Sequence, residues 1–325
     1  MTTAIPIIDL SGLETASGRA RIGKDFDRAY GASGFAYVAN HGVPKEAIDA
    51  VFAVSARFHA LPEPAKRAIA VNRHHRGYLG FASGTDRASN IEAAAHPNLS
   101  ESFIKLYEPG IKLYEPGAAG SSANPLDGPN QWPEGLAGFK DTVLTYEAHL
   151  ERLARALVRI MADVIAGDAA ALDPAFERPT SWLRLLHYPA RPANAPPGLY
   201  GSAPHTDFGA FTFLAQDAAG GLQVRAPDGE WIDVPPRPGT FIVNTGEAVP
   251  VWSGGRWRST PHRVVNPKGR ERYSVAYFFD PGFDTMIRPL GSCRSGNTVA
   301  GFRFGDHVMS QLDATYDYRE ADAGG

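Results

Sequence analysis

The sequence predicts an α+β protein dominated by β structure: a jelly-roll core with an N-terminal helical region and a C-terminal helix. Three observations lead to this fold class. Helical periodicity prevails up to about residue 180, short β-type segments separated by Gly/Pro turns begin at residue 181, and a last helical segment covers about 305–316. Helices followed by a run of strands are typical of helices packed against a double sheet.

The N-terminal half is predicted to contain two short strands and three helices. Strands are expected at residues 5–10 and 34–39, where apolar residues cluster next to Ser-Gly pairs. A helix is expected over 15–32, because apolar residues recur there with helical spacing. A second helix should begin at Pro44, since proline suits the first helical turn. The third should run from Pro133 to about residue 166 with one apolar stripe.

Irregular sequence separates these helices. Residues 72–100 are small and polar, which predicts a long loop with at most a short strand, and long loops often border active sites. The heptapeptide IKLYEPG occupies 104–110 and is repeated letter for letter at 111–117. Two copies are too few for a solenoid, so we expect a tandem duplication in a surface loop, where insertions are tolerated. Residues 119–133 are linker-like.

The C-terminal half is predicted to form the sheets. Seven segments combine β-branched and aromatic residues with flanking turn residues: TSWLRLLHY, GAFTFLAQ, GLQVRA, EWIDVP, GTFIVNTG, HRVVN and RYSVAYFFD. We therefore expect one domain over 1–325, made of a mainly helical region (1–180) and a jelly-roll catalytic core with its closing helix (181–325).

Composition excludes several function classes. There are 32 Lys and Arg against 35 Asp and Glu, a net charge of −3, so a non-specific nucleic-acid binder is not expected. The single cysteine, Cys293, can form neither an internal disulfide nor a cysteine-rich zinc site. No signal peptide or membrane-spanning stretch is visible, so a cytoplasmic protein without a membrane partner is expected, with its oligomeric state left open.

A metal site is predicted from the histidines. Two His and one carboxylate on one face of an octahedron are typical of non-haem iron oxygenases. The pattern His-x-Asp/Glu occurs at His149-Leu150-Glu151, inside a predicted helix, and at His205-Thr206-Asp207, just before a predicted strand. Residues i and i+2 share a face in extended chain but not in a helix, so His205 and Asp207 are the candidate ligands.

Further candidates lie later in the chain. His262 heads the predicted strand HRVVN and can supply a third ligand. Arg272 and Ser274 follow across the turn 266–270 and share one face of the next predicted strand. A guanidinium group can bind a carboxylate through two parallel hydrogen bonds, so this pair suits a carboxylate ligand.

These residues and their order give the sequence a clear resemblance. It is similar to the iron(II)/2-oxoglutarate-dependent dioxygenases, in the branch that resembles isopenicillin N synthase. The similarity covers most of the chain and is carried by GFAYVANHGVP, NLSESF, PHTDFGAFTFLAQD, GGLQV, PGTFIVNTGE, STPHRVVNP, RYSVAYFFDP and LDATY. It implies the double-stranded β-helix form of the jelly roll.

The resemblance also implies roles for single residues. His205, Asp207 and His262 would be the iron ligands, and Arg272 with Ser274 would bind the distal carboxylate of 2-oxoglutarate. Tyr188 matches a tyrosine that contacts the cosubstrate in some members. An asparagine often found near that tyrosine is replaced here by Leu186, so a role for Tyr188 as a core residue stays open.

The implied activity is oxidation, in particular hydroxylation, of a small molecule with release of succinate and CO2. The implied cofactors are Fe(II), 2-oxoglutarate as cosubstrate, and O2. Alternatives are an Fe(II) oxidase or cyclase of the same fold that does not use 2-oxoglutarate, an inactive binding protein, and a zinc hydrolase. No motif specifies the substrate, or hydroxylation over desaturation or ring closure.

Other conspicuous side chains are assigned mainly to the scaffold or the solvent. We expect His74 and His75, in the 72–100 loop, to be exposed or else to lie at the edge of the pocket, and at most one of His187 and Tyr188 to face the site. His41, Asn244 and Glu247 are expected to support the fold. Either packing or a position at the border of the site is expected for Trp252, Trp257, Arg258 and Phe279.

Overall fold

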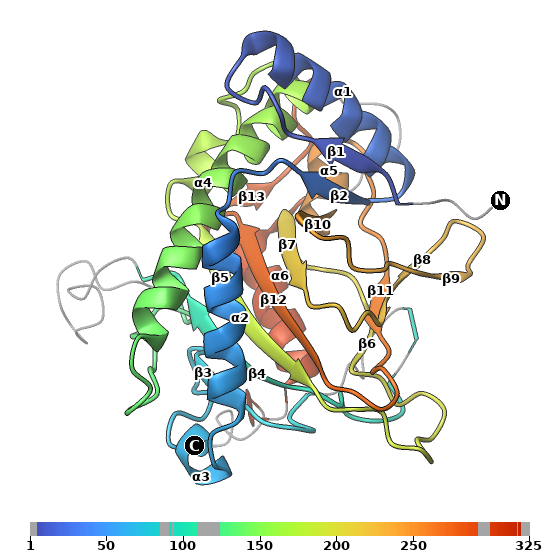
Figure 1. The fold of residues 1–325 in the computed structure, drawn as a ribbon. Helices are drawn as coiled ribbons and strands as arrows, with labels where there is room; N and C mark the ends of the chain where they lie inside the picture. Colours follow the sequence, from blue (N-terminus) through green and yellow to red (C-terminus); the bar gives the residue numbers. More distant parts are fainter. Residues whose placement is uncertain are drawn as a thin grey trace.

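The computed structural model describes residues 5–84, 91–92, 94–108, 124–291, 300–316 and 318–319. Its centre is a large sheet that runs through the molecule, with long helices on one side and a smaller sheet on the other (Figure 1). This is the predicted combination of a jelly-roll core, an N-terminal helical region and a C-terminal helix. No helix in the described part is long and apolar enough to cross a membrane.

The large sheet has eight strands, and its middle is formed by the predicted C-terminal segments. Only the pair β1 and β2 is parallel; the other neighbours are antiparallel. In spatial order the strands are β1 (Ile7–Asp9), β2 (Phe35–Ala39), β10 (Thr240–Thr245), β7 (Phe211–Gln216), β12 (Arg272–Asp280), β5 (Thr180–Tyr188), β4 (Glu101–Leu106) and β3 (Gly77–Leu79).

The second sheet has four antiparallel strands, in the order β6 (Ser202–His205), β11 (His262–Val264), β8 (Leu222–Arg225) and β9 (Trp231–Asp233). Apolar side chains from both sheets pack together between them, among them Tyr188, Leu222 and Val264. Two sheets that bury their facing sides against each other are the defining feature of a jelly roll. The short strands β13 (Met286–Ile287) and β14 (Phe302–Arg303) form a separate hairpin-like pair.

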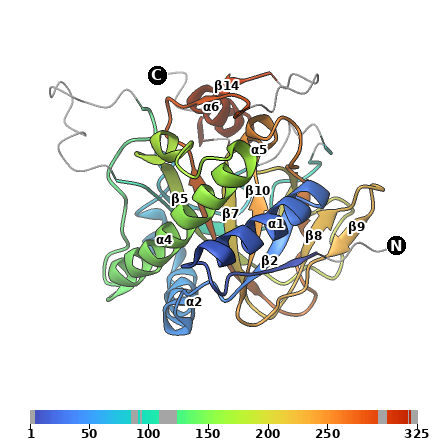
Figure 2. The same ribbon diagram turned by 90° about the horizontal axis from the view of Figure 1, so that it is seen from above.

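The helices cover the other face of the large sheet. In Figure 2 the long helices α1, α2 and α4 lie on one side of this sheet, and α6 lies near the opposite edge of the molecule. A larger apolar core fills the space between the long helices and the sheet. The helices are α1 (Ala16–Ala32), α2 (Lys45–His59), α3 (Glu63–Arg67), α4 (Phe139–Ala166), α5 (Ala248–Trp252) and α6 (Phe304–Thr315), with a 3-10 turn at Asp173–Phe176.

Two predictions about the N-terminal half need correction. The long helix begins at Phe139 rather than Pro133, because Gly138 precedes it in a left-handed conformation with φ of 75°. The first IKLYEPG copy does not lie wholly in a surface loop, since Ile104–Leu106 is the buried end of β4 between β3 and β5. Lys105 in that copy forms a buried ion pair with Glu147 of α4. The second copy, 111–117, lies outside the described residues.

Candidate metal centre

Three predicted ligands meet at one end of the small sheet. His205 is the last residue of β6, His262 is the first residue of β11, and the two face each other in the antiparallel register. Asp207 follows β6 by two residues. Its Oδ1 atom lies 3.7 Å from Nε2 of His205 and 3.7 Å from Nε2 of His262. The potential ligand atoms of all three residues lie within 4.8 Å of one another.

The histidine tautomers suit metal binding. Nδ1 of His205 lies 2.7 Å from the carbonyl oxygen of Ala203, and Nδ1 of His262 lies 3.3 Å from that of Thr260. Since a carbonyl can only accept, each Nδ1 carries a proton, which leaves each Nε2, turned toward Asp207 Oδ1, as the nitrogen that can bind a metal. At 3.7 Å these pairs are too long for hydrogen bonds. Imidazole and carboxylate ligands bind metals at about 2 Å, so one ion fits among the three atoms.

The other carboxylate oxygen of Asp207 is held by the large sheet. Thr212 Oγ1 donates a hydrogen bond of 2.5 Å to Oδ2, and Asn244 Nδ2 donates one of 2.6 Å. Burial favours the neutral acid. The charges of His262 and His205 and these two hydrogen bonds outweigh it, so the pKa of Asp207 is lowered. Burial, followed by repulsion from His205, lowers the pKa of His262. The site therefore favours an ionised Asp207 and a neutral His262, the forms that bind metals.

A buried acid fixes the loop that carries Asp207. Asp280, at the end of β12, accepts hydrogen bonds from the Ala210 backbone N–H at 2.8 Å and from Trp182 Nε1 at 3.2 Å. Gly209 lies so close that a Cβ atom there would sit 1.8 Å from Asp280 Oδ1. Burial raises the pKa of Asp280 to about 8. The loop thus follows one path, set by the large sheet, and only glycine fits at its tightest point.

The predicted carboxylate-binding pair lies on β12 of the large sheet, on the face that is turned toward the small sheet. Arg272 and Ser274 alternate on β12, and Arg272 Nη1 donates to Ser274 Oγ at 3.0 Å. Its Nη2 donates to Gln216 Oε1 at 3.2 Å, and the ring of Tyr188 lies 4.6 Å from the guanidinium carbon. Arg272 is fully buried, and its Nε has no hydrogen-bond partner among the described residues. A buried guanidinium with only neutral neighbours is suited to a carboxylate ligand.

Two cavities adjoin the candidate ligands, one lined by all three of them and the other by His205 and Asp207. One extends toward Arg272 and Tyr188 and is also lined by Leu186, His262 and Asn244. The other extends toward the C-terminal helix and is also lined by residues from five separate segments, among them His75, Asn98, Trp182, Phe208 and Tyr316. The two cavities have five lining residues in common: His205, Asp207, Arg184, Ser202 and Phe278. A metal ion bound by the three ligands would therefore adjoin two cavities, one of which ends at the buried guanidinium of Arg272.

Some secondary predictions are confirmed and others are wrong. Tyr188 faces the site, whereas His187 on the opposite face binds Glu101 Oε1 at 2.7 Å. Of the two alternatives for His75, exposure is wrong and the position at the pocket is confirmed: the residue is buried, lines the second cavity and hydrogen-bonds Tyr318. Phe279 is not a pocket wall but stacks on Phe176 in the core, because its neighbour Phe278 takes the inward-facing position.

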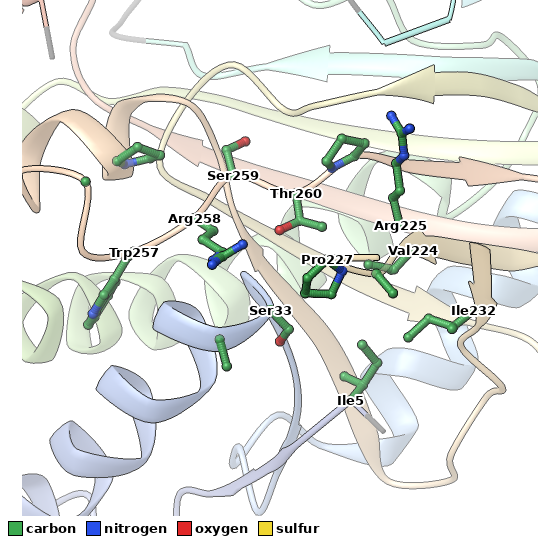
Figure 3. A pocket seen from close by; sticks show the side chains of 15 residues that line it. Ile5, Ser33, Val224, Arg225, Pro227, Ile232, Trp257, Arg258, Ser259 and Thr260 are labelled. Atoms are coloured by element: carbon green, nitrogen blue, oxygen red, sulfur yellow. The ribbon is translucent and has the colours of Figure 1, made fainter. Parts of the chain in front are cut away.

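Trp257 and Arg258 do not border the predicted ligands. Figure 3 shows both around a separate pocket, together with Ser259, Thr260 and Ile5, and none of the three ligands lines it. Trp257 is buried there, with its indole N–H 2.9 Å from Asp27. Trp252 is likewise a core residue. This segment therefore contributes packing rather than a wall of the site.

Four contributors were not predicted as site residues: Thr212, Asn244, Arg184 and Tyr316. Thr212 and Asn244 carry a weak signal, because each lies at an alternating position of a strand next to the predicted ligands. Arg184 shares the inward-facing alternation of β5 with Leu186 and Tyr188. Tyr316 carries no local signal, since only the tertiary fold brings the end of α6 to the second cavity.

Comparison with protein families gives two matches. The family described as the 2OG-Fe(II) oxygenase superfamily matches residues 179–281. The family described as "non-haem dioxygenase in morphine synthesis N-terminal" matches residues 5–135. Together the two matched ranges cover well over half of the chain and include all the candidate ligands.

Individual relatives agree with the families. A 2-oxoglutarate-Fe(II) type oxidoreductase of Emericella nidulans is 33% identical over 300 residues, covering 90% of this chain and 83% of the relative. A homoarginine-6-hydroxylase of Glycine max is 31% identical, covering 95% and 96%. Among solved structures, a full-length Neurospora crassa protein in complex with alpha-KG and thymine has a TM-score of 0.80 and 29% identity, covering 95% of this chain and 96% of that one.

Proposed function

The chain belongs to the iron(II)/2-oxoglutarate-dependent dioxygenases, and from this premise we propose that it hydroxylates a small molecule at a centre formed by His205, Asp207 and His262. As a member of this family the protein is an oxidoreductase whose cofactors are Fe(II) and 2-oxoglutarate. The proposal concerns which residues carry out each role and what class of substrate is oxidised.

A single observation carries the assignment of the iron ligands. One carboxylate oxygen and the Nε2 atoms of two imidazoles converge at distances too long for hydrogen bonds, while Thr212 and Asn244 occupy the remaining oxygen of Asp207. An unused cluster of this kind would be costly to bury, because its polar atoms would have no partner. Two histidines and one carboxylate on one side of an ion leave its other positions open for ligands.

We assign the cavity that ends at Arg272 to 2-oxoglutarate. Arg272 would bind the distal carboxylate, Ser274 would position the guanidinium by the hydrogen bond at 3.0 Å, and the ring of Tyr188 would support its face. When bound, iron and 2-oxoglutarate together supply the oxidising chemistry, with release of succinate and CO2. Leu186, Leu214 and Val264 make the cavity walls apolar and keep water away from the cosubstrate.

The second cavity is proposed to hold the substrate. It is lined by side chains from β4, β5, β6, β12 and α6, and it shares His205 and Asp207 with the first cavity. A substrate there would lie next to the ligands on the side away from Arg272. The relatives support a small molecule, since the Neurospora crassa protein is described in complex with thymine.

The proposal is tested by visible spectroscopy without oxygen. Fe(II) and then 2-oxoglutarate are added to the metal-free protein, and a weak charge-transfer band that requires both additions is expected. The band should disappear in His205→Ala and weaken in Arg272→Ala, whereas His149→Ala, in the helical His-x-Glu motif, should retain it. Iron binding without a band would favour an oxidase that does not use 2-oxoglutarate. Absence of iron binding would contradict the site assignment.

A further inference from the structure

The substrate cavity contains one arginine that the proposed mechanism does not use. Arg184 lies on β5, and with Leu186 and Tyr188 it faces the space between the sheets. Arg184 is opposite Ala276 of β12, whereas Tyr188 is opposite Arg272. Arg184 and Tyr188 are four residues apart on the strand, so the register positions of Arg184 and Arg272 are separated by about 13 Å along the strand direction. The two arginines therefore lie at opposite ends of one inner face, with the candidate iron ligands facing the space between them.

The partners of Arg184 are neutral. Nε donates to Ser102 Oγ at 3.0 Å, and Nη1 donates to the Tyr316 hydroxyl at 3.2 Å. Among the described residues no Asp or Glu forms an ion pair with Arg184, and Nη2 donates no hydrogen bond. Tyr316 accepts from Arg184, and its own O–H has no acceptor in the described part of the chain. Two donors next to the cavity thus lack an acceptor.

The charges of the complete site leave room for one anion. Iron(II), Asp207, Arg272 and the 2-oxoglutarate dianion together carry no net charge. Arg184 then leaves one positive charge in a cavity whose lining, among the residues that the structure describes, contains no acid other than Asp207. A partly buried cation of this kind is stabilised by a paired anion. A substrate with one negative charge would neutralise this positive charge, whereas a phosphate dianion would leave the site with a net negative charge.

From these observations we infer that the substrate is a carboxylic acid with an apolar, ring-containing body, and that Arg184 and Tyr316 bind its carboxylate. The inference rests on the proposed function and names its substrate class. The guanidinium supplies Nη2 and the tyrosine supplies its hydroxyl, so that each carboxylate oxygen receives one hydrogen bond. Trp182, Phe208 and Phe278 offer aromatic surfaces for the rest of the molecule.

The test uses two probes of equal shape and different charge, phenylacetate and phenylacetamide. Each is titrated without oxygen into the full-length protein loaded with Fe(II) and 2-oxoglutarate, and binding is followed by the change in the charge-transfer band. The wild type should bind the acid at least tenfold more tightly than the amide. Arg184→Gln should reduce this preference to within about twofold while keeping the band.

Two control variants separate charge from structure. Arg184→Lys keeps the charge and should retain part of the preference. Tyr316→Phe removes one hydroxyl donor and should weaken the acid while leaving it preferred over the amide. Equal binding of the two probes by the wild type, or no change in the band with either, would overturn the inference. Loss of the band itself in Arg184→Gln would also overturn it, because Arg184 would then be required for binding 2-oxoglutarate rather than the substrate.

The inference and the proposed function fail in different ways. If the wild type gives no band, the proposed function fails, and the two probes are compared by their effect on the melting temperature of the metal-free protein. An acid preference that Arg184→Gln abolishes would still support the carboxylate subsite. Equal shifts by the acid and the amide would reject it.

Discussion

Asn244 donates a hydrogen bond of 2.6 Å to Oδ2 of Asp207, the oxygen of that carboxylate that does not face the two histidines. The bond orients Oδ1 toward the candidate metal position, and Asn244 itself is fixed in β10, between β2 and β7. Groups that orient metal ligands typically change metal affinity about 10–100-fold when they are removed. We predict a loss of Fe(II) affinity within this range for Asn244→Ala, measured by anaerobic titration.

Thr212 provides the matched comparison for Asn244. Thr212→Val keeps the shape but removes the hydroxyl that donates to Asp207 Oδ2, so it should also weaken Fe(II) binding. Thr212→Ser keeps the hydroxyl and should bind Fe(II) like the wild type. Unchanged affinity in both Asn244→Ala and Thr212→Val would show that the Asp207 orientation does not depend on these bonds.

The second prediction concerns the 2-oxoglutarate cavity. Arg272→Lys keeps the charge but loses the planar group that contacts Ser274, Gln216 and the ring of Tyr188. It should raise the KM for 2-oxoglutarate at least tenfold, with a smaller increase for Ser274→Ala. KM is obtained from succinate formation at varied 2-oxoglutarate, and the binding constant from the charge-transfer band.

Two substitutions of Tyr188 distinguish the contribution of its ring to 2-oxoglutarate binding from that of its hydroxyl group. Its aromatic ring lies 4.6 Å from the Arg272 guanidinium carbon. If the ring carries its role, Tyr188→Phe should change the KM for 2-oxoglutarate less than about threefold, whereas Tyr188→Ala should raise it severalfold. An increase in Tyr188→Phe as large as in Tyr188→Ala would instead assign the hydroxyl to the cosubstrate.

The third prediction concerns the close contact between Gly209 and Asp280. A methyl group at position 209 would meet Asp280 Oδ1 at 1.8 Å, so either the loop or the end of β12 must move. Overpacking of this kind costs about 1–3 kcal/mol. Gly209→Ala should lower the free energy of unfolding by about this amount and weaken Fe(II) binding, because Asp207 is two residues away. Gly269→Ala, in the turn before β12, tests a glycine with open space around it, although its φ of 71° adds strain.

The fourth prediction uses the buried acid on β4. Glu101 accepts hydrogen bonds from His187 at 2.7 Å, Lys66 at 2.6 Å and Tyr78 at 2.5 Å. Burial alone would raise its pKa, but these bonds outweigh burial and lower the pKa to about 2, from an ordinary value of 4.5. The ionised form therefore stabilises the fold above pH 4.5, and this stability is lost as the pH falls toward 2.

Glu101→Gln tests this linkage. At neutral pH the variant should lose up to about 3 kcal/mol of unfolding free energy, since each pKa unit corresponds to about 1.4 kcal/mol. The difference from the wild type should shrink between pH 4.5 and pH 2, as measured by denaturant unfolding. Glu63→Gln removes a more exposed partner of Lys66 and should cost less than about 1 kcal/mol at every pH. A pH-independent difference for Glu101→Gln would contradict the lowered pKa.

Local sequence patterns predicted the β-rich half well because its strands carry dense apolar alternation. The patterns also singled out His205, Asp207, His262, Arg272 and Ser274, since each lies at or near a strand end. That they share one site was implied by the family resemblance. Strand β6 (Ser202–His205) was not predicted, because only pairing with β11 makes so short a segment extended. The sequence could not decide between exposure and the pocket edge for His75 for a related reason: its burial depends on Tyr318 and α6, which are more than 200 residues away in the sequence.

The last prediction concerns the repeated IKLYEPG. Removing either copy yields the same sequence, in which Glu-Ser-Phe is still followed by Ile-Lys-Leu and then Tyr-Glu-Pro-Gly. All of β4 (Glu101–Leu106) is therefore kept, including the buried pair between Lys105 and Glu147. The seven-residue deletion should retain Fe(II) binding and unfold within about 1 kcal/mol of the wild type, because the sequence predicts a surface loop for the repeat beyond β4, and loop length contributes only weakly to stability.

Lys105→Met is the contrasting change in the same repeat. It leaves Glu147 buried without its cation, and breaking a buried ion pair from one side typically costs about 3–5 kcal/mol. Because burial raises the pKa of Glu147 even beside Lys105, the acid can take up a proton, and the loss should be smaller at about pH 5 than at about pH 8. Denaturant unfolding at both pH values measures this. Loss of Fe(II) binding in the deletion variant, with Lys105→Met unaffected, would show that the second copy and not β4 supports the site.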